Sequence, residues 1–173
     1  MKGTILKCLQ EMVESRFGKE EWQSILGDAG FKSAPLFSLS ADIDEGKALA
    51  LFASTARVLE ISAEKAADAF GDYWVNEYAS RVYQTIYARH KSAREFLLAM
   101  DGVHVMVTES VSNARPPRFD FEWQGEKSLL VTYKSQRGLI DLYIGLARGV
   151  GKRFDTPLEI QKLSPRQVKI TFP

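Results

Sequence analysis

Cysteine and histidine are scarce in this sequence of 173 residues, which has one cysteine and two histidines. The single Cys8 excludes an intramolecular disulfide framework and any zinc site built from cysteines. No apolar run approaches the roughly 20 residues that a membrane-spanning helix needs. The start, MKGTILKC, also lacks the cleavage pattern of a signal peptide. We therefore expect a cytoplasmic protein without a membrane span.

An excess of charge of either sign is missing too. Lys and Arg number 23 and Asp and Glu 22, which leaves a net charge of +1. Proteins that bind nucleic acid or anionic membranes through a basic surface need a clear positive excess, so the balance argues against both. The composition is otherwise that of a globular protein, 45% hydrophobic and 26% charged. We expect residues 1–173 to form a single domain with a sizeable core.

Helical spacing dominates the first two thirds of the chain. Apolar residues recur every three or four positions over 5–17, 49–59 and 66–78. The best-marked helix begins at Ser92, because Ser92 and Glu95 have the spacing of a capping box, in which each side chain satisfies a free backbone N–H of the first turn. Its apolar stripe continues to residue 111, and the prolines at 116 and 117 then end helical structure.

The period of the pattern changes after the prolines. Residues 119–123 alternate between aromatic and acidic side chains, and a second strand is predicted over 129–133, which together indicate a hairpin. One helix follows with an apolar face over 139–150, and two further strands are predicted over 158–163 and 167–172. Helices first, and then antiparallel strands around one helix, predict the α+β class.

The two histidines have different surroundings. His90 lies in a basic cluster before a helix start, as a solvated histidine does. His104 falls in the apolar stripe with Met100 and Val107, so it faces the core. Such a residue is by default a core histidine bonded to a carbonyl oxygen, and the alternative is axial ligation of a haem iron by a neutral imidazole. No second His, Cys or carboxylate stands at helical spacing on that face, which disfavours a metal site without a cofactor.

The segment Tyr133-Lys134-Ser135-Gln136-Arg137 is the second chemical feature. Alternation along a strand puts Tyr133, Ser135 and Arg137 on one side of the chain. Two hydroxyls and a guanidinium suit one or two carboxylates, although a strand edge that ends in a surface arginine explains the same residues equally well. Haem carries two propionates, so this segment and the helical histidine support each other.

Together these features resemble the H-NOX domain (haem nitric oxide/oxygen binding), the fold of the haem sensor region of soluble guanylate cyclase and its bacterial relatives. The resemblance covers essentially the whole chain, and the tyrosine–serine–arginine motif downstream of a helical histidine is its most specific part. It implies an α+β H-NOX fold, with an N-terminal helical part, an antiparallel sheet with packed helices, and haem between them. The matching segments are Met1-Lys2-Gly3-Thr4-Ile5, Met100-Asp101-Gly102-Val103-His104, Pro116-Pro117, Tyr133-x-Ser135-x-Arg137 and Gly145-Leu146.

The resemblance also implies roles for single residues. His104 corresponds to the proximal ligand of a five-coordinate haem b, and Tyr133, Ser135 and Arg137 correspond to the clamp on its propionates. Pro117 matches the proline that presses on the macrocycle and distorts it. The positions that match residues packed on the haem faces are Ile5, Met100 and Leu146.

The distal side of the haem decides which gas is bound. Oxygen-binding members of the family place a distal tyrosine hydroxyl where it donates to the oxygen, but this sequence has Leu142 at that position and Leu9 beside the same pocket. Such a hydrogen bond contributes about 0.5–1.5 kcal/mol, and more when buried and charge-assisted. Nitric oxide and carbon monoxide need it far less, so we expect discrimination against oxygen. Trp74 and Tyr78 complicate this expectation, because each carries a potential donor on the distal side.

The function implied by the resemblance is a sensor domain rather than an enzyme. It binds nitric oxide and carbon monoxide, and it signals when nitric oxide breaks the bond between the iron and His104. The implied partners are a histidine kinase, a cyclic-di-GMP enzyme or a fused chemotaxis receptor in a bacterial cytoplasm. Two rivals are a haem electron-transfer or haem-carrier protein, for which no second axial ligand is evidently placed, and an interaction module without haem, which has no use for both His104 and the tyrosine–serine–arginine motif.

Overall fold

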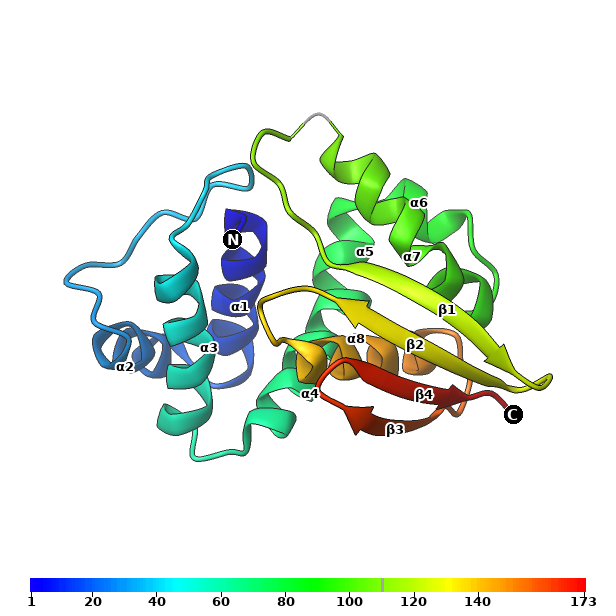
Figure 1. Ribbon diagram of the computed structural model, residues 1–173. Coiled ribbons are helices and arrows are strands. Elements are labelled where there is room, and N and C mark those ends of the chain that lie inside the picture. Colours follow the sequence, from blue (N-terminus) through cyan, green and yellow to red (C-terminus); the bar gives the residue numbers. More distant parts are fainter. Residues whose placement is uncertain (110) are drawn as a thin grey trace.

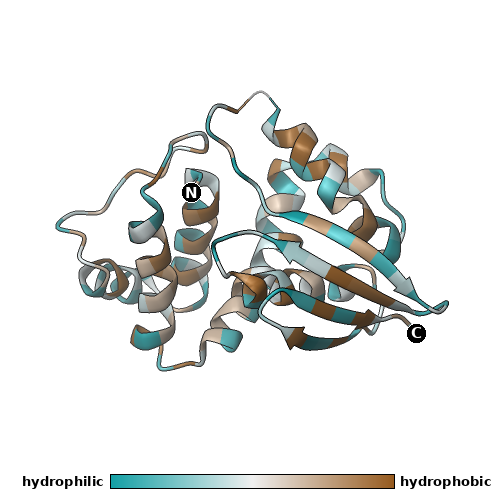
Figure 2. Cartoon of the chain, in the orientation of Figure 1, coloured by the Kyte–Doolittle hydropathy of each residue, from teal (hydrophilic) through white to brown (hydrophobic). Residues whose placement is uncertain are grey.

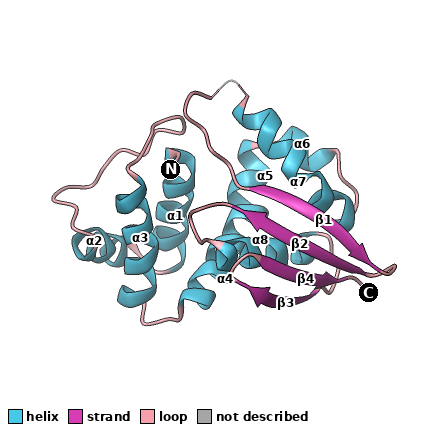
Figure 3. Ribbon diagram, viewed as in Figure 1, coloured by secondary structure: helices cyan, strands magenta, loops and turns pink. Residues whose placement is uncertain are grey.

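The computed structural model describes residues 1–109 and 111–173, in which helices precede an antiparallel sheet (Figure 1, Figure 3). Three helices gather at the N-terminal end: α1 (Gly3–Arg16), α2 (Lys19–Asp28) and α3 (Glu45–Val58). Five helical segments follow: α4 (Ala63–Tyr73), the π-helix η1 (Trp74–Tyr78), α5 (Ala79–Val82), α6 (Gln84–Ala88) and α7 (Ala93–Thr108). The last elements are β1 (Arg118–Gln124), β2 (Ser128–Lys134), α8 (Ile140–Arg153), β3 (Glu159–Ser164) and β4 (Gln167–Thr171).

The four strands form one antiparallel sheet in the order β1-β2-β4-β3. The predicted hairpin is β1–β2, in which Phe119 pairs with Tyr133, and Val131 pairs with Val168 where β2 meets β4. Because β2 lies inside the sheet, its middle is hydrophobic over several residues, as Figure 2 shows, whereas the edge strand β3 is largely exposed. Helices followed by antiparallel strands around α8 confirm the α+β class.

The buried apolar residues form two cores. The N-terminal core lies among α1, α2, α3 and α4, and Leu6 and Leu51 are fully buried in it. The sheet-side core lies among α7, α8 and the sheet, and includes Leu129. Two side chains, Trp74 and Leu146, pack against both cores. They therefore mark the boundary between the two cores.

The two parts of the molecule are joined where α4 crosses α8. A Cβ atom on Gly71 would lie 2.1 Å from the carbonyl carbon of Gly145, and one on Gly145 would lie 2.2 Å from the carbonyl oxygen of Ala67. One turn later, a Cβ on Gly149 would lie 2.7 Å from the carbonyl oxygen of Gly71. The backbones approach so closely that no side chain fits between them, which is why glycine occupies this crossing.

The start of α7 follows the predicted pattern with one difference. The hydroxyl of Ser92 accepts from the backbone N–H of Glu95 at 3.2 Å, as expected. The Glu95 carboxylate, however, accepts from the N–H of Lys91 at 2.8 Å, so the second half of the capping box closes one residue early. The helix ends at Thr108, so Val111 lies beyond it, and Ser110 is outside the described residues.

The helix predicted over 66–78 is divided in the structure. It is α-helical up to Tyr73 and then forms the π-helix η1, whose hydrogen bonds reach back five residues rather than four. Apolar spacing alone does not reveal such a turn, because the residues that face inward are still apolar when a single turn of the helix widens. Among the described residues, no helix is both long and apolar enough to cross a membrane.

Candidate functional site

The helix α7 carries His104 on a half-buried side. Its first half is buried through Phe96 and Leu97, whereas Val105 and Met106 are exposed on its outer side. His104 is turned away from these two exposed residues, and its ring lies against Phe119 of β1 with the ring centres 5.6 Å apart. The histidine is therefore packed between the helix and the sheet.

One hydrogen bond determines the form of the imidazole. Nδ1 of His104 lies 3.2 Å from the carbonyl oxygen of Pro117, and burial lowers the pKa of His104. A carbonyl oxygen only accepts hydrogen bonds, so Nδ1 carries the proton and donates. The neutral ring then keeps a lone pair on Nε2, which is the form that binds a metal ion.

A carboxylate that the sequence analysis missed holds the same turn of α7. Asp101, three residues before His104, accepts from Nε of Arg118 at 2.7 Å and from the backbone N–H of Phe119 at 2.9 Å. The Arg118 guanidinium, which binds both carboxylate oxygens, lowers the pKa of Asp101 to about 2. These bonds fix α7 against the start of β1. The expectation that no carboxylate stands at helical spacing on the face of His104 is therefore wrong, because Asp101 lies three residues before it, and this spacing was visible in the sequence.

Replacing Asp101 by Asn should therefore lower stability in a pH-dependent way. A depressed pKa contributes stability that is present above the ordinary pKa near 4 and lost as the pH falls toward 2. The pair is partly exposed, so after screening by water the expected loss for Asp101→Asn at pH 7 is about 1 kcal/mol. Urea unfolding at pH 7 and pH 3 measures this loss. The control is Asp120→Asn, because Asp120 of β1 forms an exposed ion pair with Lys134. A loss that is equal at both pH values would contradict the assignment.

The motif of Tyr133, Ser135 and Arg137 lies partly outside the strand. The strand β2 ends at Lys134, so Tyr133 is its last buried residue, and Ser135 and Arg137 belong to the turn that follows. The hydroxyl of Ser135 accepts from the backbone N–H of Arg137 at 3.3 Å, and Gly138 completes the turn at a φ of +66°. The expectation that strand alternation aligns all three side chains is therefore wrong, because a turn presents the last two.

Arg137 already binds a carboxylate in this structure. Its Nε donates to Glu45, the first residue of α3, at 2.5 Å, and a terminal nitrogen donates to the carbonyl oxygen of Arg115 at 2.6 Å. A guanidinium has five N–H donors, so further donors remain for a second carboxylate. The donor set therefore fits the propionate groups of a haem. Nothing in the sequence pairs Glu45 with a residue 92 positions away.

The apolar residues assigned to the haem faces and the distal side are divided between the two cores. Trp74 and Leu146 contact both cores, while Leu142 packs against the N-terminal core together with Ile5. Leu9 is buried within the N-terminal core, and Met100 packs against the sheet-side core.

The aromatic residues of η1 and α8 point to different cores. Tyr78 is buried in the N-terminal core, and its ring lies 5.5 Å from that of Trp74. Tyr143 is buried in the sheet-side core instead, with its ring 4.9 Å from Phe119. Its hydroxyl has no hydrogen-bond partner within the described residues. Leu142 and Tyr143 are neighbours in α8, and their side chains therefore pack against different cores.

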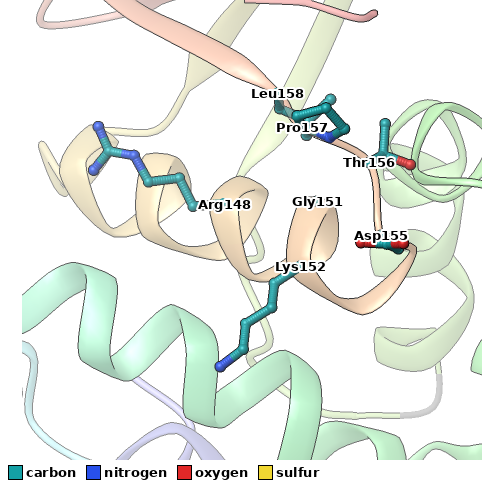
Figure 4. Close-up of a pocket in the computed structure, with 7 residues that line it drawn as sticks. All are labelled: Arg148, Gly151, Lys152, Asp155, Thr156, Pro157 and Leu158. Atoms are coloured by element: carbon teal, nitrogen blue, oxygen red, sulfur yellow. The ribbon is translucent and has the colours of Figure 1, made fainter.

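A surface hollow of about 470 Å³ lies elsewhere, at the end of α8 (Figure 4). Arg148 and Lys152 line it, but they extend in different directions, and each pairs with an aspartate of α4, at 2.6 Å for Asp68 and 2.8 Å for Asp72. The carbonyl end of a helix also repels anions. The hollow is therefore a poor anion site.

Comparison with known families gives a match over most of the chain. A family model described as Haem-NO-binding matches residues 2–162. The chain is also similar to the soluble guanylate cyclases gcy-35 and gcy-37 of Caenorhabditis elegans, with 25% and 23% identity over 172 residues. Each alignment covers 96% of this chain but 25% and 24% of the relative. The chain thus spans about a quarter of the length of these relatives.

Solved structures share the fold. An H-NOX protein from S. oneidensis in the Fe(II) state, solved as a triple mutant, matches with a TM-score of 0.90 at 18% identity, over 100% of this chain and 96% of that chain. An oxygen-binding H-NOX domain related to soluble guanylate cyclases, in its oxygen complex, matches with a TM-score of 0.83 at 22% identity, over 99% and 95%. The expected fold is therefore confirmed, and identities this low say nothing about the gas.

Proposed function

The chain belongs to the haem-NO-binding (H-NOX) family of haem-binding gas-sensor domains, and on this premise we propose that it binds nitric oxide and carbon monoxide at a five-coordinate haem b and excludes oxygen. The observation that carries the proposal is the state of His104, whose Nδ1 donates to Pro117 and whose Nε2 is left for the iron. When bound, the haem would supply an iron, held by Nε2 of His104, that can bind a gas.

The remaining residues of the site support the same role. Arg137, with three of its five donors unused in the two bonds described, receives a propionate, and the hydroxyls of Tyr133 and Ser135 lie on the same short segment. Pro117 orients His104 through its carbonyl oxygen and would press on the macrocycle of a bound haem. Ile5, Met100 and Leu146 would exclude water from the haem faces.

The gas selectivity follows from the distal residues. Leu142 and Leu9 offer no hydrogen-bond donor, and an apolar distal side favours gases that need none. Oxygen is the gas whose binding would depend most on a hydrogen-bond donor from the protein, whereas nitric oxide and carbon monoxide would depend on one far less. The domain therefore discriminates against oxygen by withholding a hydrogen bond.

Signalling uses the tether on α7. If nitric oxide binding to the haem released His104, α7 would keep only its other contacts with β1, through Asp101 and the sheet-side core. The helical and sheet parts would then be free to shift relative to each other. A partner that binds the two arrangements unequally reads the shift as a signal. We propose a bacterial cytoplasmic setting, with a histidine kinase, a cyclic-di-GMP enzyme or a fused chemotaxis receptor as that partner.

Absorption spectra of the reduced protein test the proposal directly. We expect a five-coordinate ferrous spectrum that changes under nitric oxide and carbon monoxide and gives no stable oxygen complex in air. A six-coordinate low-spin spectrum before any gas is added would point instead to electron transfer. A protein that takes up no haem at all would overturn the proposal.

The substitution Leu142→Tyr tests the distal part of the proposal in the same spectra. A tyrosine hydroxyl at this position should raise oxygen affinity by about tenfold or more, the ratio that corresponds to one buried hydrogen bond. The matched control is Tyr143→Phe, because Tyr143 is the next residue of α8 but lies in the sheet-side core. An unchanged oxygen affinity in Leu142→Tyr would show that residue 142 does not face the gas.

A further inference from the structure

Tyr78 is one of the two residues, with Trp74, that carry a potential hydrogen-bond donor on the proposed distal side. Tyr78 ends the π-helix η1, and only 2% of its surface is exposed. Its ring lies 5.5 Å from the ring of Trp74, at the boundary between the two cores. A phenol in this position would be able to favour oxygen if its O–H were available to the gas.

That hydroxyl has a partner on another helix. It lies 3.2 Å from the hydroxyl oxygen of Thr4, in the first turn of α1 and next to Ile5. The contact joins residues 74 positions apart, so it also ties η1 to α1. Burial raises the pKa of Tyr78, so the phenol keeps its proton at neutral pH.

The direction of this hydrogen bond follows from burial. Tyr78 is buried and Thr4 is half-buried. A buried O–H without an acceptor is costly, whereas a half-buried hydroxyl can direct its own proton elsewhere. The arrangement with the lower free energy has Tyr78 donating and Thr4 accepting.

We propose that Thr4 determines gas specificity by positioning: it accepts the hydroxyl proton of Tyr78 and so withholds from the gas a donor that would favour oxygen. This inference rests on the proposed haem-based sensing. It assigns the exclusion of oxygen to two features, the leucines on the distal side and the occupied hydroxyl of Tyr78. Thr4 acts through Tyr78 and makes no contact with the gas itself.

The substitution Thr4→Val tests this role, because valine has the shape of threonine without the hydroxyl. The Tyr78 O–H then loses its acceptor, and oxygen affinity should rise by about tenfold, while affinities for nitric oxide and carbon monoxide stay nearly unchanged. The stretching frequency of bound carbon monoxide should fall, as it does when a donor approaches. Thr4→Ser keeps the hydroxyl and should behave as the wild type, and Thr4→Val with Tyr78→Phe should lose the gain.

Urea unfolding of the wild type, Thr4→Val, Tyr78→Phe and the double variant gives a readout that does not depend on gas binding. The stability losses of Thr4→Val and Tyr78→Phe should not add, because either change removes the same hydrogen bond. Losses that add, or an oxygen gain that persists without the Tyr78 hydroxyl, would overturn the inference. If the wild type excludes oxygen and Thr4→Val does not change the oxygen affinity, the inference about Thr4 is overturned while the proposed function stands. A wild type that holds oxygen in air would overturn the proposed function, and the inference with it.

Discussion

Replacing His104 by alanine should abolish stable haem binding. The imidazole is the only protein ligand that the proposal assigns to the iron, and its Nδ1 bond to Pro117 holds the ring in the metal-binding form. Loss of a single orienting partner of a metal ligand already costs about 10–100-fold in affinity, so loss of the ligand itself should cost more than about 100-fold. Haem content after purification, and titration of the haem-free protein with haem, both measure this.

Added imidazole should restore part of the binding, since it supplies the missing ligand in the space left by the side chain. His90→Ala is the matched control, because His90 lies near the start of α7 and bonds the carbonyl oxygen of Ile86 at 2.9 Å. This control should keep the wild-type ferrous spectrum. The same spectrum in His104→Ala without imidazole would refute the ligand assignment.

Replacing Gly145 by alanine should have the largest effect on stability. The added Cβ would lie 2.2 Å from the carbonyl oxygen of Ala67, and that atom belongs to the backbone of α4 and cannot rotate away. The helices must then separate, which opens gaps along the whole crossing. Overpacking of this kind costs about 1–3 kcal/mol or more, and here we expect the upper end, about 3 kcal/mol.

The matched control for this change is Gly102→Ala, in the middle of α7, where a Cβ would meet nothing within 4 Å. It should raise stability by about 0.5–1 kcal/mol, because alanine favours the helix more than glycine does. Thermal or urea unfolding of the two variants gives opposite signs if the crossing is as tight as the structure has it. Equal effects would mean that α4 and α8 adjust their spacing freely.

The sequence predicted those elements whose signals are local. The cap at Ser92, the alternation after the prolines and the apolar face of α8 each depend on neighbours within one or two turns, and the structure has all three. The stripe of α7 likewise placed His104 on an inward side. These are the patterns that secondary structure imposes directly on a sequence.

The contacts that hold the site's side chains depend on residues far apart in the chain, and spacing does not reveal them. The bonds from Arg137 to Glu45 and between Thr4 and Tyr78 each join segments more than 70 positions apart. The turn at Ser135 was also not predicted, because polar residues at the end of a strand and polar residues in a following turn look alike in the sequence. The π-helix was not predicted for a related reason. It changes the angle between the side chains of Trp74 and Tyr78 and leaves the polarity pattern of the sequence unchanged.

The crossing of α4 and α8 has a consequence for how the chain is made. Gly71 and Gly145 meet in the folded protein, but on a ribosome that adds 5–20 residues each second, the second glycine is made on the order of 4–15 s after the first. In that interval α1, α2 and α3 can already close the N-terminal core around one side of α4. The other side, with its row of small residues, has no partner until α8 emerges. Until α8 is made, this side of α4 therefore has no packing partner in the nascent chain.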